Sequence, residues 1–274
     1  MFNKHPKGLI AAALATLGER FGFYTMMAIL VLFLQAKFGM NGKEAGFIYS
    51  TFYFSIYILA LVGGIIADKT RNYKGTIFTG IVLMAVGYLL LAIPSKTPVD
   101  NKMLYLVITC ASLFVIAFGN GLFKGNLQAL VGQMYDNPQY ANMRDSGFSL
   151  FYMFINIGAI FAPFAAVGVR NWWLSTFGYN YDADLPALCH GQLAGTLSPE
   201  ATETYHTLVT KASTAPVQDY TAFASDYLNV FTTGFHYAFG VAIIAMAISL
   251  TIYWLNKKNF PDPSKKTVAS SASS

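Results

Sequence analysis

Two stretches of this sequence carry charged residues inside runs that are otherwise apolar. The stretch "GERFGFYTMMAIL" places Glu19 beside Arg20, and "FGNGLFKGNLQAL" contains Lys124. An ionisable residue within a membrane span costs about 2.5–3.5 kcal/mol on insertion scales, so such residues are functional candidates by default. Two bases with one acid leave an excess positive charge, which suits an anionic group such as a carboxylate. Arginine can bind a carboxylate through two parallel hydrogen bonds, whereas lysine adds a point charge on a flexible stem.

The polar residues of the first stretch fall on one face of a helix. Thr16, Arg20 and Tyr24 follow one another at intervals of four residues, with Glu19 and Phe23 beside them. Residues four apart lie above one another on a helix surface. The resulting polar stripe on an apolar helix must face protein or water and not lipid.

A purely structural role for the same charges is the main alternative. In that interpretation Glu19 and Lys124 form a buried ion pair that joins two helices, and Arg20 bonds to backbone carbonyls or to Asn156. The pairing accounts for one acid and one base. It leaves the second base uncompensated.

The composition is typical of a helical membrane protein. The 274 residues are 55% hydrophobic and 11% charged, whereas soluble domains carry about 25% charged residues. Apolar runs that approach or exceed the roughly 20 residues needed to span a bilayer cover 9–36, 46–67, 75–94, 103–133, 147–169 and 230–256. Six such runs do not fit a soluble protein, and they lack the alternation of a β-barrel. We therefore expect an all-α membrane protein with six transmembrane helices.

The distribution of basic residues predicts the orientation. With the N-terminus inside, ten Lys or Arg residues fall in inner segments and six in outer loops, where most acids also lie. Positively charged loops resist translocation, so both termini are expected in the cytoplasm. The net charge of +5 follows from this bias and gives no reason to expect nucleic-acid binding.

These runs divide the chain into five segments. We expect a cytoplasmic N-terminus over 1–8, transmembrane helices 1 to 5 over 9–169, an extracytoplasmic loop or cap over 170–229, transmembrane helix 6 over 230–256, and a cytoplasmic linker or truncated tail over 257–274. Secondary transporters commonly consist of two six-helix halves with the substrate site between them. The chain therefore has the organisation expected of the first half of a larger transporter.

Three helices are expected to bring polar groups to one depth. Arg20 lies about ten residues from the cytoplasmic start of its span, or about 15 Å at 1.5 Å per residue. Lys124 and Asn156 lie about nine residues, or about 14 Å, from the cytoplasmic ends of theirs. All three residues are predicted near the bilayer midplane.

Other chemistries find no support in the sequence. Cys110 and Cys189 form no metal-site spacing, and no nucleophile lies with a base in the spans, so we expect neither a metal site nor an enzyme. Gly119, Gly121 and Gly125 approach a dinucleotide-binding pattern but lack its preceding strand. We interpret these glycines as helix-packing residues that also leave room for a ligand beside Lys124.

Four motifs together resemble the proton-coupled oligopeptide transporter family (POT, also called PTR) of the major facilitator superfamily. They are "GERFGFYTMMAIL", "GGIIADKTRNYKG", "GNGLFKGN" and "RDSGFSLFYMFINIGAIFAP". The resemblance covers all six spans in order. It implies the N-terminal six-helix bundle of a major facilitator superfamily fold.

The resemblance also implies roles for individual residues. Arg20 and Lys124 would hold the carboxylate of a di- or tripeptide, and Tyr24, Asn156 and Asn120 would complete the substrate site. Glu19 would take part in proton coupling, so protons are the coupling ion and no cofactor is expected. The "GxxxDK" spacing at Asp68 and Lys69 is similar to a loop that helps close the cytoplasmic side in this superfamily, and its alternative interpretation is a charged helix end. The expected partners are a small peptide, the lipid bilayer and a C-terminal six-helix half, and the expected location is the plasma (bacterial inner) membrane.

Two positions depart from the family pattern. Thr16 stands where the family usually has the first glutamate of its ExxER motif, which shifts the proton-coupling role to Glu19. Phe23 stands where tyrosine is common. Two alternatives remain, namely a transporter of the same fold for another anionic solute such as nitrate or an amino acid, and a non-transporting membrane protein.

Overall fold

The computed structural model describes residues 4–261 and contains eight α-helices within that range. Six helices are long and apolar enough to cross a membrane: α1 (Gly8–Phe38), α2 (Gly42–Thr70), α3 (Tyr73–Ala92), α4 (Lys102–Met134), α5 (Arg144–Thr176) and α8 (Tyr220–Asn256). Two shorter ones, α6 (Leu185–Ala194) and α7 (Pro199–Ala212), lie between α5 and α8. Single 3-10 turns, Ala141–Met143 and Lys257–Asn259, precede α5 and follow α8. This is the predicted all-α membrane fold.

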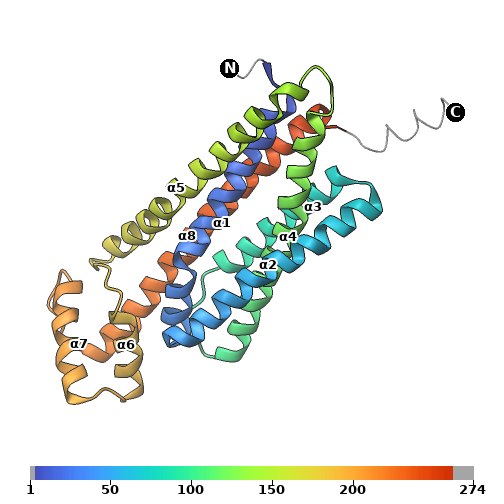
Figure 1. The fold of residues 1–274 in the computed structure, drawn as a ribbon. Coiled ribbons are helices and arrows are strands. Elements are labelled where there is room, and N and C mark those ends of the chain that lie inside the picture. The colour runs from blue at the N-terminus through green and yellow to red at the C-terminus, as the bar shows by residue number, and fades with distance from the viewer. Residues whose placement is uncertain (1–3, 262–274) are drawn as a thin grey trace.

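The long helices form two groups, and the main contact between them joins α3 to α8. Helices α1, α5 and α8 run side by side, and α2 and α3 pack against α4 (Figure 1). The short helices α6 and α7 lie at one end of the bundle (Figure 1). At the opposite end, the start of α1 at Gly8 lies against Asn259 and Phe260. Both ends of the described chain therefore lie at the same end of the bundle, as an even number of spans requires.

Local polar residues set the ends of the helices. Gly39 ends α1 with a positive φ of 62°, a conformation that glycine adopts without strain. Asn41 then starts α2 in a capping box with Glu44, in which each side chain accepts a backbone N–H of the other residue. The turn "GMNGKE" between α1 and α2 is therefore built around these three residues.

Glycines allow α2, α3 and α4 to approach closely. A Cβ atom at Gly121 would lie within 3 Å of the backbone of Leu59 in α2, and one at Gly119 would lie within 3 Å of Gly80 in α3. This agrees with the packing role expected for both residues. Gly125 differs, because a Cβ atom there would meet nothing within 4 Å. The packing interpretation of Gly125 is therefore wrong.

The predicted loop over 170–229 is largely helical. Helix α5 continues to Thr176, and α8 begins at Tyr220, ten residues before the predicted start of the sixth span. The side chain of Asp219 accepts the backbone N–H groups of Thr221 and Ala222 and so caps α8. At 37 residues, α8 is about 55 Å long and exceeds the hydrocarbon thickness of a bilayer by almost a factor of two.

Helix α7 is amphipathic. Ser198 caps its start and Pro199 occupies the first position, where a missing N–H costs nothing. Tyr205, Val209 and Ala212 recur at helical spacing and are buried. Neighbouring α6 buries Cys189, whose thiol is free and whose pKa is raised to about 12 by burial. Together the two helices form a compact cap. Most of the predicted tail, residues 262–274, lies outside the described residues.

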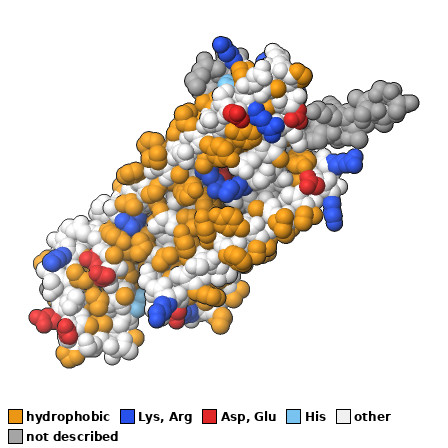
Figure 2. All heavy atoms as spheres, viewed as in Figure 1, with side chains coloured by type: hydrophobic (Ala, Val, Ile, Leu, Met, Phe, Trp, Pro, Cys, Tyr) orange, Lys and Arg blue, Asp and Glu red, His pale blue; other side chains and the backbone are white. Residues whose placement is uncertain are grey.

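Hydrophobic side chains cover much of the visible surface of the bundle, and a Lys or Arg group lies near its middle (Figure 2). Helices α2 and α5 are the most exposed of the long helices, with 22% and 28% of their most apolar segments buried. Helix α1, by contrast, is 61% buried in the corresponding segment. The central helix thus carries the charged motif, and its outer neighbours present apolar surfaces.

Candidate functional site

A cavity of about 160 Å³ lies where α1, α4 and α5 meet. Its lining combines three charged side chains with aromatic and polar ones. The lining residues are Thr16, Glu19, Arg20, Tyr24, Phe123, Lys124, Gln128, Phe151, Tyr152 and Ile155. The stripe predicted on the first helix, formed by Thr16, Arg20 and Tyr24, therefore faces this cavity.

Glu19 and Arg20 form a two-point ion pair on α1. The Nε atom of Arg20 donates to Oε2 of Glu19 at 2.5 Å, and an Nη atom donates to Oε1 at 2.6 Å. The Glu19 side chain is fully buried and Arg20 is 6% exposed. No ion pair joins Glu19 to Lys124 among the described residues. The alternative in which those two residues pair is therefore wrong.

Asn120 supports the same carboxylate from α4. Its Nδ2 atom donates to Oε1 of Glu19 at 2.7 Å, and its side chain is fully buried. Asn120 is absent from the residues that line the cavity. In the structure Asn120 therefore contacts Glu19 without lining the cavity, whereas the resemblance implied that Asn120 belongs to the substrate site.

Aromatic rings surround the two basic groups. The guanidinium of Arg20 lies 4.7 Å from the ring centre of Phe23 and 5.9 Å from that of Tyr24. The Nζ atom of Lys124 lies 5.7 Å from the ring centre of Tyr57 in α2. Cations attract the faces of aromatic rings at such distances, so these rings hold the positive groups without neutralising them.

The charges of the cavity leave it with an excess of one positive charge. Arg20 is neutralised by Glu19, whereas Lys124 is half-buried and has no acid partner among the described residues. An anionic group that enters the cavity meets one base that is free and a second that is held by a carboxylate.

Asn156 does not lie in this cavity. The residue is exposed on α5 and is not among the lining residues. Gly158, two residues later, packs against Leu17 and Phe21 of α1. Two residues rotate a helix by about 200°, so Asn156 points away from α1. Gly158 also lies near the Cβ atom of Arg20, so Asn156 lies at the level of Arg20 along the bundle, but the bond between them that the structural alternative allowed does not occur.

Five lining residues were not singled out from the sequence, namely Phe123, Gln128, Phe151, Tyr152 and Ile155. Gln128 lies one helical turn after Lys124, so the spacing of four residues was a usable signal. Tyr152 lies in the fifth-span motif and is 47% exposed. Phe151 is buried and gives no signal that separates it from core residues.

The other predicted residues lie at the turn between α2 and α3. Asp68 and Lys69 are both exposed there. The hydroxyl of Tyr73, at the start of α3, donates a hydrogen bond to Asp68. Asp68 therefore ties the end of α2 to the next helix.

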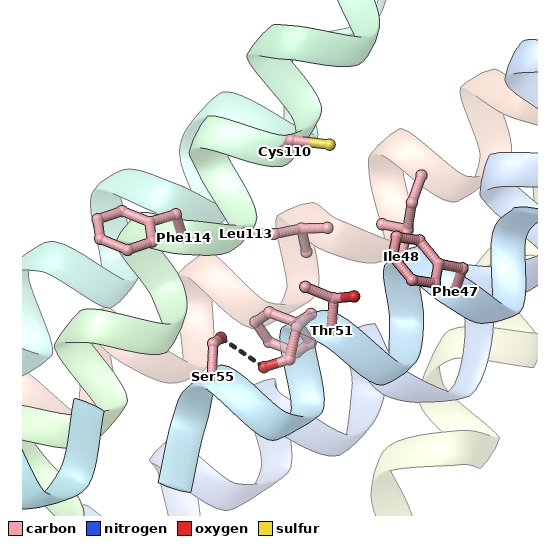
Figure 3. Close-up of a pocket in the computed structure, with 8 residues that line it drawn as sticks. Phe47, Ile48, Thr51, Ser55, Cys110, Leu113 and Phe114 are labelled. Atoms are coloured by element: carbon pink, nitrogen blue, oxygen red, sulfur yellow. Dashed lines mark hydrogen bonds between the residues drawn. The ribbon is translucent and has the colours of Figure 1, made fainter. Parts of the chain in front are cut away.

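A second cavity, of about 300 Å³, lies between α2 and α4 and is apolar. Figure 3 shows Phe47 and Ile48 on one side and Cys110, Leu113 and Phe114 on the other. The hydroxyl of Ser55 donates to a backbone oxygen of its own helix at 2.7 Å. None of its lining residues is charged, so this cavity offers no group that would recognise a charged ligand. Among residues 4–261, no cluster of His, Cys, Asp or Glu could hold a metal ion.

Six helices long and apolar enough to span a membrane, three of which line a charged cavity, define a multi-pass membrane protein. The sequence profile of the POT family matches residues 74–273, more than half of the chain. The chain belongs to the POT family, and its fold is that of the N-terminal six-helix bundle of a major facilitator superfamily transporter.

Two curated relatives carry names of peptide transporters. The chain is 34% identical over 185 residues to "Peptide transporter YePEPT" from Yersinia enterocolitica, a match that covers 66% of this chain and 34% of the relative. It is also 34% identical over 179 residues to "Dipeptide and tripeptide permease A" from Enterobacter sp.. That match covers 65% of this chain and 32% of the relative. The chain thus matches about a third of the length of these relatives.

A solved structure agrees over nearly the whole chain. The crystal structure of a peptide transporter POT in complex with sulfate has a TM-score of 0.62 and 25% identity, and the match covers 99% of this chain but 44% of that one. The bundle described above therefore corresponds to somewhat less than half of that transporter.

Proposed function

We propose that this chain forms the N-terminal bundle of a proton-coupled symporter for di- and tripeptides. The observation that carries the proposal is the cavity that joins Glu19, Arg20 and Lys124 within a six-helix bundle of the POT family. Relatives that carry the names of peptide transporters support the class of substrate.

The basic residues would bind the carboxylate of the peptide. Lys124 is the basic residue that is free to attract it, and Arg20 would join once Glu19 releases it. Tyr24 lines the same cavity and offers a hydroxyl. Asn156, which faces away from α1, would contact substrate only beyond this cavity, on the exposed side of α5.

The Glu19–Arg20 pair would couple binding to protons. As a carboxylate, Glu19 holds Arg20 through two hydrogen bonds. Protonation of Glu19 removes the charge that holds Arg20 and so allows the guanidinium to bind the peptide. Deprotonation restores the pair and favours release. No cofactor other than the coupling proton takes part.

A second six-helix bundle would complete the transporter. Alternating access requires two bundles that rock around a shared site. The exposed faces of α2 and α5 are the surfaces available for such a partner. Asp68 and Lys69, at the end of α2, would contribute to the cytoplasmic gate. We place both termini in the cytoplasm and the protein in the bacterial inner membrane.

Uptake of a labelled dipeptide by cells that express the chain together with a second, C-terminal six-helix bundle, driven by an imposed pH gradient, tests the proposal. We expect Lys124→Ala to raise KM for the dipeptide and Glu19→Gln to abolish the dependence on the proton gradient. Lys43→Ala is the matched control. It replaces an exposed lysine in the first turn of α2, and the variant should transport normally. Normal, proton-dependent uptake by both site variants would show that the residue assignment is wrong.

A further inference from the structure

The amide of Asn120 has one polar atom in use and one without a partner. Its Nδ2 atom donates to Oε1 of Glu19 at 2.7 Å. Its Oδ1 atom is buried and accepts no hydrogen bond. A buried polar group without a partner costs free energy, and native structures rarely keep one without a reason.

The partners of Glu19 fit its ionised form only. Oε1 accepts hydrogen bonds from Arg20 and Asn120, and Oε2 accepts one from Arg20. When Glu19 gains a proton, its new O–H group needs an acceptor. Arginine has no acceptor atom, so Arg20 cannot serve. The unpartnered Oδ1 atom of Asn120 belongs to a side chain that already touches Glu19.

We infer that the Asn120 amide is the hydrogen-bond partner of protonated Glu19. A hydronium ion from water in the cavity transfers its proton to Oε2 of Glu19, and a water molecule leaves. The O–H of the acid then donates to Oδ1 of Asn120, while Nδ2 continues to donate to Oε1. A primary amide and a carboxylic acid thus form a cyclic pair with two hydrogen bonds.

This pair takes the place of the pair between Glu19 and Arg20. The carboxylate prefers Arg20, and the acid prefers Asn120, so protonation moves Glu19 from one two-point partner to the other. Arg20 keeps its charge and is released toward the cavity. The inference rests on the proposed function, since it names the group that stabilises the proton-loaded state of the same site. Asn120 is a positioning residue in this scheme.

Several other groups face Glu19. Arg20 and Tyr24 lie on its own helix, and α4 and α5 contribute Lys124 and Tyr152 to the same cavity. Helix α8 places Ala245 and Ser249 against Gly18, and neither residue can titrate.

Tyr88 of α3 is the competing acceptor. Its hydroxyl is buried without a partner, and it lies close enough to Glu19 and Arg20 to interact with both electrostatically. The test must therefore distinguish Asn120 from Tyr88.

Infrared difference spectroscopy of the purified protein in lipid vesicles, between high and low pH, provides the test. Protonated Glu19 gives a carboxyl C=O band that Glu19→Gln removes, which assigns the band. We expect Asn120→Leu to move this band to higher frequency, because the acid loses both hydrogen bonds of the cyclic pair. Tyr88→Phe should leave its frequency unchanged. Asn126→Leu is the matched control, because Asn126 is also buried in α4 but donates to the backbone oxygens of Gly63 and Leu122.

A measurement on the unaltered protein guards against a variant that fails to fold. With ¹³C in the side-chain carbonyl of asparagine, one asparagine C=O band should move to lower frequency at the same pH midpoint as the Glu19 band, and Glu19→Gln should abolish this change. A Glu19 band that Tyr88→Phe shifts and Asn120→Leu does not would overturn the inference. So would an asparagine band that does not respond to pH.

The outcome is separate from that of the uptake experiment. If the spectra behave as expected but no dipeptide is transported, the proposed function fails while the role of Asn120 stands. If transport is proton-dependent but the bands do not respond, Asn120 is not the partner of the acid.

Discussion

At the scale of single residues, Thr16 sets this site apart from the usual family pattern. It is 5% exposed, lines the cavity one turn before Arg20, and donates its hydroxyl to the backbone oxygen of Ala12 at 2.9 Å. Thr16 therefore makes no bond to Arg20. Because no acid stands there, Glu19 is the one carboxylate among residues 4–261 that lines the cavity.

Thr16→Glu should weaken dipeptide binding. The new carboxylate would lie at i−4 from Arg20 and compete with the peptide for its guanidinium. A competing charge-assisted hydrogen bond of about 1.5 kcal/mol corresponds to a rise in KM of about tenfold at neutral pH. Uptake kinetics measure this change, and KM should fall again at low pH as the new acid is protonated.

Thr16→Gln is the control for that experiment, since it adds a similar volume without a charge. An equal rise in KM for both variants would attribute the effect to crowding and not to charge.

The sequence predicts which residues share a helix face better than which side chains bond. Thr16, Arg20 and Tyr24 line one cavity because a spacing of four residues is local geometry. The partner of Glu19 depends on side-chain rotamers, and the sequence did not indicate that it bonds to its neighbour Arg20. Asn156 shows the same limit, because depth follows from counting residues whereas direction depends on the rotation of the whole helix.

At the scale of elements, the contact between α2 and α4 depends on Gly121. A Cβ atom there would lie within 3 Å of the backbone of Leu59, which cannot move as a side-chain tip can. We expect Gly121→Ala to lower the free energy of unfolding by about 1–3 kcal/mol, the usual cost of overpacking. Denaturant titration followed by tryptophan fluorescence measures this change.

Gly125→Ala, four residues along the same helix, is the matched control. A Cβ atom at Gly125 meets open space, and alanine favours a helix by up to about 1 kcal/mol over glycine. The variant should be neutral or slightly more stable. Equal destabilisation by both substitutions would mean that α4 tolerates no side chain in this region, contrary to the packing described.

The contact of α6 with α1 should depend on pH. The Nε2–H group of His190 donates to the backbone oxygen of Ala36 at 2.7 Å. Burial lowers the pKa of His190 below its usual value, and nearby Lys102 adds to the effect, while the bond to Ala36 opposes it. The neutral form is therefore the stable one in the folded protein.

The sign of the pH dependence follows from that lowered pKa. The contribution of His190 to stability is complete above its unfolded pKa of about 6.5 and is lost as the pH falls through the lower folded value. Amide hydrogen exchange of α6, corrected for the intrinsic rate, should accelerate over this range. His190→Gln can still donate to Ala36 but does not titrate, so it should remove the acceleration. An unchanged pH profile in that variant would assign the effect to another group.

Helices α6 and α7 show what the sequence could have revealed. The string "SPE" at Ser198 is a usable start signal for α7, and the buried residues of α7 recur at helical spacing. The cap at Asp219 likewise indicates the early start of α8. What the sequence could not supply is the docking of α6 on α1, because that contact joins residues about 150 positions apart.

At the scale of the whole molecule, the structure shows which helix ends lie together. The side of the membrane on which each group of helix ends lies is predicted from the distribution of charged residues. The starts of α1 and α3 and the ends of α2 and α8 share one end of the bundle, and the cap of α6 and α7 lies at the other (Figure 1). Basic residues are concentrated at the first end and acidic residues around the second. The positive end should therefore remain in the cytoplasm.

Cysteine labelling in intact cells tests this orientation. In a background with Cys110→Ala and Cys189→Ala, single cysteines placed by Lys7→Cys and Lys257→Cys should react with a membrane-impermeant maleimide only after the cells are permeabilised. Glu203→Cys, on the exposed face of α7, should react in intact cells. The reverse labelling pattern would show that the protein has the opposite orientation. Protons and peptide would then reach Glu19 and Lys124 from the opposite side of the membrane. Labelling of all three positions in intact cells would instead show that the bundle has no fixed orientation, which a directional symporter cannot tolerate.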